Sequence, residues 1–289
     1  MDTAQDIANE TIIKFISMNG AGNKFLIHDS RYKRIDMNKD LILYLYNHKD
    51  LISFDQFVQI NRPERNGDVK VSFWNSDGTV AEMCGNAVRC IAHLIIKETL
   101  KKEIKIETIT KEIICWENGD NISVNMGVPN FMWDEIPLKG ENKNFSTILI
   151  DLPDPPCELP KFSAVNVGNP HAVFFFNDNL TPKLSKFGKK IEKNKIFSKG
   201  VNVSFAVIVD QENINLSVWE RGAGATLACG SAACATAVAA ARLNLTKRAV
   251  TITLPGGNLE INWKKDDHIV MTGPYEFNGE DIIDVSNYK

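Results

Sequence analysis

The chain has 289 residues, of which 44% are hydrophobic and 24% are charged. These fractions are typical of globular proteins and exclude a disordered, collagen-like or coiled-coil chain. The 33 basic and 36 acidic residues give a formal charge of −3, and because nucleic-acid-binding domains usually carry a basic excess, we expect no nucleic-acid partner.

The first ten residues include acidic side chains and lack the basic-then-apolar order of a signal peptide. No later run is apolar over the roughly 18 residues that a membrane-spanning helix needs. We therefore expect a cytoplasmic protein with no membrane partner. Alternation of apolar and polar residues predicts strands at 68–74 and 214–219. Further strands, separated by polar turns, are expected at 25–30, 57–61, 104–109, 122–126, 172–176, 205–210, 250–254 and 259–263.

Helical spacing predicts helices at 40–46, directly after Cys84, at 184–194 and at 232–243. The lysine-rich stretch 183–199, interrupted by Glu192, is typical of a solvated helix face. Many strands around one or two central helices predict an α/β chain of the α+β type, with largely antiparallel sheets rather than a doubly wound parallel sheet.

The length predicts two domains. We expect residues 1–130 to form one domain, with the tail 275–289 packing on it, and residues 131–274 to form the other. An internal repeat supports this division, because Ser, Trp, Cys, Gly and Ala recur in one register at an offset of 145 between the segments that lead to Cys84 and Cys229. The chain therefore consists of two similar halves.

The six cysteines are too dilute for a disulfide scaffold, and their spacing does not match a structural zinc site, so we expect no metal. Cys84 and Cys229 occupy matched positions at the start of a predicted helix. The positive end of a helix favours a thiolate and can lower the pKa of such a cysteine from about 8.5 towards neutrality.

One thiolate and one thiol on opposite sides of a carbon atom could invert a stereocentre, because one removes a proton while the other delivers one. Two other interpretations stay open at this point. Both cysteines could simply fill the core at a helix start, or they could form a redox couple, although the sequence contains no Cys-x-x-Cys motif.

Ten sequence blocks, in order, resemble the diaminopimelate epimerase family. They are MNGAGN (18–23), FDQ (54–56), NSDG (75–78), CGNAVRC (84–90), GNPH (168–171), NV (202–203), ERGAG (220–224), CGS (229–231), PGG (255–257) and MTGP (271–274). The resemblance implies two pseudo-symmetric domains, each a sheet curled around a central helix, with the active site in the cleft between them. It further implies interconversion of LL- and meso-diaminopimelate, in lysine and peptidoglycan precursor synthesis, by a homodimer without a cofactor.

The resemblance also implies that Cys84 and Cys229 are the catalytic acid and base. The implied substrate-binding residues are Asn23, Gln56, Asn75, Gly85, Asn86, Asn169, Asn202, Glu220, Arg221, Gly230 and Ser231. Asn23, Asn75, Asn169 and Asn202 would fix the distal end of the substrate and help to orient the reacting end. Glu220 and Arg221 would bind the distal ammonium and carboxylate groups. Backbone N–H groups at the two helix starts would hold the α-carboxylate. Gln56 would lie on a closing loop, and His171 would pack beside the site.

The alternatives differ in substrate or in class. A proline-racemase-like or phenazine-biosynthesis-like isomerase would share the duplication, but Glu220 and Arg221 favour a substrate with a second amino-acid end. A non-catalytic binding protein of this fold would be expected to lack one of the two cysteines, and both are present. A redox-regulated protein would join Cys84 and Cys229 in a disulfide after oxidation.

Overall fold

The computed structural model describes residues 12–48, 53–81, 83–136, 138–139, 147–150, 152, 159–177, 183–285 and 288. It divides into two compact units: unit 1 is Met1–Ile122 with Pro274–Lys289, and unit 2 is Ser123–Gly273. The sequence placed the first domain boundary after residue 130, whereas the structure has it after Ile122. The next residue, Ser123, is bound to unit 2, because its hydroxyl lies 2.7 Å from that of Thr272 in a buried hydrogen bond.

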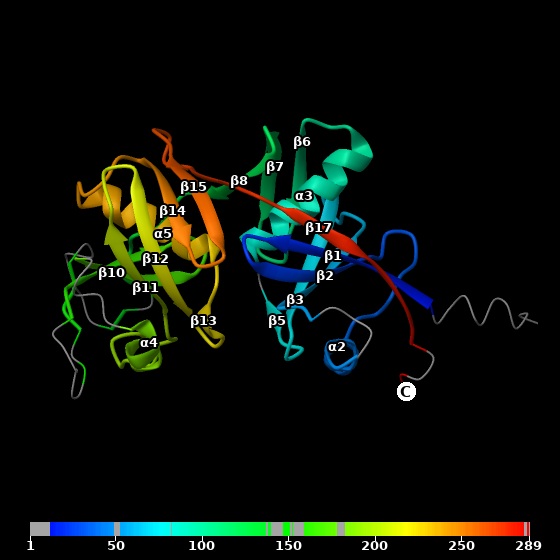
Figure 1. Cartoon of the computed structure of the whole chain (residues 1–289), viewed down its shortest axis with the longest axis horizontal. Coiled ribbons are helices and arrows are strands. Elements are labelled where there is room, and N and C mark those ends of the chain that lie inside the picture. Colours follow the sequence, from blue (N-terminus) through cyan, green and yellow to red (C-terminus); the bar gives the residue numbers. More distant parts are fainter. Residues whose placement is uncertain are drawn as a thin grey trace, which may run out of the picture. The chain divides into compact units, whose positions relative to one another are not determined.

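In the described residues, unit 1 consists of a mixed sheet with the helices α2 and α3 (Figure 1). Its strands are β1 (Ile12–Gly20), β2 (Asn23–Asp29), β3 (Gln56–Asn61), β4 (Val69–Asn75), β5 (Val80–Ala81), β6 (Glu103–Glu107), β7 (Glu112–Asn118) and β17 (Glu276–Asp284), and its helices are α2 (Lys39–Tyr46) and α3 (Gly85–Thr99). Hydrogen bonding gives the strand order β17-β1-β2-β3-β4-β6-β7, with β5 in a hairpin with β4. The pairs β2–β3 and β4–β6 are parallel and the other pairs are antiparallel.

Unit 2 repeats this plan. Its strands are β8 (Asn121–Gly127, mostly in unit 2), β9 (Phe162–Asn166), β10 (Pro170–Phe176), β11 (Asn202–Ile208), β12 (Asn213–Glu220), β13 (Gly224–Thr226), β14 (Ala249–Leu254), β15 (Gly257–Trp263) and β16 (Ile269–Gly273), and its helices are α4 (Leu184–Glu192) and α5 (Gly230–Arg242). The order is β9-β10-β11-β12-β14-β15-β16-β8, with β10–β11 and β12–β14 parallel. The parallel pairs therefore recur at equivalent places in both halves.

Each unit wraps its sheet around one helix. Helix α5 contacts β9, β10, β11, β14, β15 and β16, and α3 contacts β1, β2, β6 and β7. Ten residues of α5 are buried, six of them alanines, because small side chains let the helix approach the strands closely on many sides. The prediction of an α+β fold made of two similar halves, with mostly antiparallel sheets, is confirmed.

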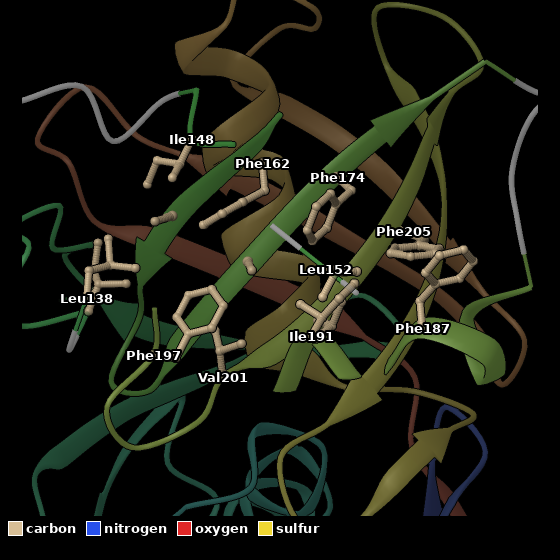
Figure 2. Packing of buried hydrophobic residues seen from close by; sticks show 14 of the residues in the cluster. Leu138, Ile148, Leu152, Phe162, Phe174, Phe187, Ile191, Phe197, Val201 and Phe205 are labelled. Atoms are coloured by element: carbon tan, nitrogen blue, oxygen red, sulfur yellow. The ribbon is translucent and has the colours of Figure 1, made fainter. Parts of the chain in front are cut away.

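Helix α4 packs on the other face of the unit 2 sheet. Phe187 and Ile191, one turn apart, point into an apolar cluster, and Figure 2 shows Phe187 beside Phe205 of β11 and Ile191 beside Leu152. The rings of Phe187 and Phe205 have centroids 6.1 Å apart. Burial of each such side chain contributes about 1.5–3 kcal/mol, so this helix is fixed firmly on the sheet.

Candidate functional site

The two matched cysteines are the N-cap residues of the two central helices, as the sequence predicts. Cys84 has φ −136° and ψ 109°, and Cys229 has φ −140° and ψ 112°. Each cysteine carbonyl accepts the first bond of its helix at 3.0 Å. Among the described residues neither helix start has a side-chain cap hydrogen bond, although the Ala232 N–H interacts with the Cys229 sulfur. N–H groups of a first helical turn have no acceptor within their own helix, so both helix starts are suited to bind an anion beside a thiol.

The surroundings of the two thiols differ. Cys84 is partly exposed, whereas Cys229 is 6% exposed, with its sulfur 3.4 Å from the Ser231 hydroxyl. Burial, and then the negative charge of Glu220, raise the pKa of Cys229 well above its usual value, although Ser231 and a backbone N–H oppose the shift. The expectation of a lowered pKa is therefore wrong for Cys229, because desolvation outweighs the helix N-terminus.

A tight turn carries Glu220 and Arg221. Strands β12 and β13 form a hairpin, and the Ala223 N–H donates to the Glu220 carbonyl at 3.2 Å. Gly222 has φ +82°, a conformation that suits glycine at this position of a turn. The Glu220 carboxylate accepts a hydrogen bond of 2.6 Å from the Thr226 hydroxyl. The hairpin thus holds this carboxylate where its charge acts on Cys229.

Three further predicted site residues meet in unit 2. The Asn202 side chain accepts from the Arg221 N–H at 2.9 Å and donates to the Pro170 carbonyl at 3.0 Å. His171 Nε2 lies 2.8 Å from Asn169 Oδ1 and donates to it, because the amide oxygen can only accept. These bonds bring Asn169, Asn202 and Arg221 into one cluster.

His171 is completely buried. Burial, and then the positive charge of Arg221, lower the pKa of its imidazole to about 3. The ring is therefore neutral at physiological pH, and its Nδ1 is buried with no hydrogen-bond partner among the described residues. The sequence interpretation of His171 as a packing neighbour of the site stays a prediction.

In unit 1 the strand pairing places Gln56 opposite Asn75. Gln56 Nε2 donates to Asn75 Oδ1 at 3.0 Å, and Asn75 Nδ2 donates to the Thr79 hydroxyl at 3.0 Å. Two amide oxygens, Gln56 Oε1 and Asn23 Oδ1, are buried and accept no hydrogen bond within the described part of the chain. Such oxygens cost about 1–3 kcal/mol each unless a donor binds, so they are suited to an ammonium group or another N–H donor.

The peptide at the start of α3 is held from two sides. Asn86 is 1% exposed, and its Oδ1 accepts from Arg89 Nη1 at 3.0 Å. The fully buried Arg89 also donates from Nε to the Pro274 carbonyl at 3.2 Å. On the other side lies Gly20 of β1, where an added Cβ would stand 2.8 Å from the Asn86 carbonyl oxygen. Sequence reasoning gave Arg89 no role, and the one available signal was a charged residue within an apolar helix.

The predicted site residues therefore form two groups. Unit 1 contains Asn23, Gln56, Asn75, Cys84, Gly85 and Asn86, and unit 2 contains Asn169, Asn202, Glu220, Arg221, Cys229, Gly230 and Ser231. Among the described residues, no three His, Cys, Asp or Glu side chains are grouped so that they could hold a metal ion. The described helices include none with the length and apolar character that crossing a membrane requires.

Comparisons with known proteins give a consistent result. A sequence model of the family described as diaminopimelate epimerase matches residues 15–132 and 163–278. A protein named diaminopimelate epimerase from Rhizobium meliloti is 40% identical over 279 residues, covering 94% of this chain and 92% of that protein. A protein of the same name from Brucella anthropi is 40% identical over 273 residues, covering 92% of this chain and 90% of that protein.

Solved structures share the fold at low sequence identity. A hydroxyproline epimerase from Agrobacterium vitis has a TM-score of 0.69 at 10% identity, covering 94% of this chain and 92% of that one. A probable proline racemase from Agrobacterium radiobacter has a TM-score of 0.68 at 13% identity, covering 96% and 94%. A Bacillus anthracis phenazine biosynthesis protein of the PhzF family has a TM-score of 0.65 at 14% identity, covering 94% and 99%.

Proposed function

The chain belongs to the diaminopimelate epimerase family, and from this premise we propose that Cys84 and Cys229 exchange the α-proton of LL-2,6-diaminopimelate to give the meso isomer. The enzyme is an isomerase, and its place is in lysine biosynthesis. One observation carries the proposal: two cysteines occupy repeat-equivalent helix N-caps with nearly the same backbone angles but different surroundings.

The proton transfers balance without a further reactant. The Cys84 thiolate takes the α-proton from one face of the substrate carbon, and the Cys229 thiol gives its proton to the opposite face. After turnover Cys84 is the thiol and Cys229 the thiolate, so the reverse reaction uses the opposite roles. The raised pKa of Cys229 supports this assignment, since it keeps that residue protonated at neutral pH before the first turnover.

Charge that develops at the α-carbon is delocalised into the adjacent carboxylate. We assign that carboxylate to the N–H groups at Gly85-Asn86 and Gly230-Ser231, which begin α3 and α5. Donors fixed before the reaction stabilise a developing anion without reorganisation, and this is usually the largest electrostatic contribution to catalysis. The hydrogen bond from Arg89 to Asn86 supports the assignment, because it fixes one of these two helix starts.

The distal end of the substrate carries an ammonium and a carboxylate. Arg221 supplies a guanidinium for that carboxylate, and Glu220 supplies a negative charge for the ammonium. Asn169 and Asn202 support these assignments through the cluster they form around Arg221. The amide oxygens of Asn23, Asn75 and Gln56 add acceptors in unit 1, where Gln56 lies on the segment we expect to close over the substrate.

We also propose a cytoplasmic homodimer. A pair of thiols that must stay reduced suits a reducing compartment. In the strand order of the described residues β17 is outermost in unit 1, and it exposes Phe277 and Ile282, so its edge is available for pairing. Light scattering is expected to give twice the monomer mass of 32.3 kDa; a monomer at the concentration of the activity assay would contradict the dimer.

The experiment that tests the function follows α-proton exchange from LL-diaminopimelate in deuterium oxide by NMR, with reductant and no added cofactor. The wild-type protein is expected to exchange the α-proton and accumulate the meso isomer. The single variants Cys84→Ala and Cys229→Ala are expected to lose epimerisation while remaining folded. A folded Cys229→Ala variant with near-normal turnover would contradict the two-cysteine mechanism. A folded, reduced wild-type protein without exchange would contradict the substrate, and a proline-type amino acid would then be tested.

A further inference from the structure

The lysines of stretch 183–199 are exposed, as the sequence predicts, and Glu192, which interrupts them, is buried. Glu192 ends α4 and is only 9% exposed. Its carboxylate accepts two hydrogen bonds, one from the Trp219 indole N–H at 2.8 Å and one from the Gly222 backbone N–H at 3.0 Å. The two donors flank Glu220 and Arg221, so one buried carboxylate holds both sides of the dipeptide that we assign to the distal end of the substrate.

All three backbone N–H groups of residues 221–223 are used. Their acceptors are the Asn202 side chain at 2.9 Å, the Glu192 carboxylate at 3.0 Å and the Glu220 carbonyl at 3.2 Å. These acceptors come from β11, from α4 and from the turn itself. The orientation of the turn is therefore set by two separate elements of unit 2 in addition to its own closing bond.

The Trp219 indole packs against helix α4 and contacts two residues on one face of that helix. Gly188 lies one turn before Glu192 on the same helix face. An added Cβ at Gly188 would stand 2.3 Å from Trp219 Cδ2, so the indole lies directly against the glycine while its N–H reaches the carboxylate. Phe187 and Ile191 fix the helix in the apolar cluster (Figure 2), and Glu192 thereby occupies a rigid position.

The duplication supplies an internal comparison. Helices α2 and α4 begin 145 residues apart, at Lys39 and Leu184, and the same offset places Asn47 opposite Glu192. Asn47 donates its side-chain Nδ2 to the Leu43 carbonyl of its own helix at 2.7 Å. Unit 1 thus builds the same fold with a neutral side chain that caps its own helix, so the fold does not require a carboxylate at this position.

We propose that Glu192 is a positioning residue for substrate recognition: by fixing the Glu220–Ala223 turn, it sets the affinity for the distal amino-acid end of the substrate. This inference rests on the proposed function. Glu192 acts through the turn and not on the reacting carbon. Its removal should therefore weaken substrate binding more than it slows the chemical step.

The test is Glu192→Gln. Glutamine keeps the size of the side chain but has one acceptor oxygen, so its NH2 group must face either the Trp219 indole or the Gly222 amide, and one of the two bonds is lost. We expect KM for diaminopimelate to rise about tenfold, the effect of one lost bond to a charged group, while kcat changes less than threefold. The Gly222 amide and Trp219 indole resonances should shift in ¹⁵N–¹H NMR spectra.

Phe187→Leu is the matched control, because it loosens the packing of α4 without removing either hydrogen bond. It should lower the melting temperature and leave KM near the wild-type value. Unchanged KM in folded Glu192→Gln, an equal rise of KM in Phe187→Leu, or unmoved Gly222 and Trp219 resonances would each overturn the proposal. Failure of the proposed function is distinguishable, since the wild-type protein would then not turn over diaminopimelate, whereas the NMR measurement would still report whether Glu192 fixes the turn.

Discussion

Lowering the pH from 7 to 5 should destabilise the protein through His171, which is completely buried in unit 2. Its pKa is lowered from 6.5 to about 3, first by burial and second by the charge of Arg221. Between these two values the unfolded chain binds a proton on His171 that the folded chain does not bind. The free energy of unfolding therefore falls as the pH falls through this range.

The magnitude follows from the two pKa values. Each pH unit in this range is equivalent to about 1.4 kcal/mol, and the loss begins near the unfolded value of 6.5. At pH 5 the accumulated loss is about 2 kcal/mol, a large part of the usual stability of a domain. The loss stops growing once the folded protein also binds the proton, near pH 3.

The assay is urea unfolding followed by tryptophan fluorescence at pH 7, 6 and 5, with His171→Gln as the comparison. Glutamine can still donate to Asn169 but does not titrate, so the variant removes the proton-linked loss while all other titrating groups remain. Wild type should lose about 2 kcal/mol more than the variant between pH 7 and pH 5. Parallel stability curves for the two proteins would refute the assignment of a buried, neutral His171.

Two further predictions concern buried hydrogen bonds. Arg89→Met removes the Arg89 donor from Asn86 Oδ1 and from the Pro274 carbonyl. We expect the free energy of unfolding, measured by chemical denaturation, to fall by about 1–3 kcal/mol, and kcat to fall as well. A variant with full activity would show that Asn86 needs no such support. Ser123→Ala and Thr272→Val each remove the 2.7 Å bond between these two residues. The double variant should lose less free energy of unfolding than the sum of the two single variants. Strict additivity of the two losses would show that the hydroxyls are not coupled.

Sequence periodicity located some strands with one buried face, and it missed others, β1 and β7, whose burial also alternates. Strand β12 has the alternating burial pattern that the sequence shows, and its predicted and observed bounds differ by one residue at each end. Strands β9 and β17 gave no such signal. Four of the five residues of β9 are buried, and most of β17 is exposed, so neither strand alternates, and only pairing with β10 or β1 defines it.

The candidate site was predictable to the extent that it is local. The repeat places Cys84 and Cys229 at helix starts, and the structure confirms this position. The surroundings of Cys229 were not predictable, because its burial and the approach of Glu220 depend on the β12–β13 hairpin. The sequence gave Glu192 no role for the same reason, since its two donors lie far along the chain from α4.

The differences between the two halves matter more for the proposed chemistry than their likeness. The proposed inversion starts from one thiol and one thiolate, so a difference between the surroundings of the two cysteines bears directly on it. At the offset of 145 the counterpart of Glu220 is Asn75, a neutral amide bonded to Gln56 and Thr79. In unit 2, burial and then the charge of Glu220 raise the pKa of the Cys229 thiol, whereas the equivalent Cys84 of unit 1 is partly exposed. We therefore propose that divergence at this turn after the duplication favours Cys229 as the thiol from which the proposed inversion of the LL isomer starts.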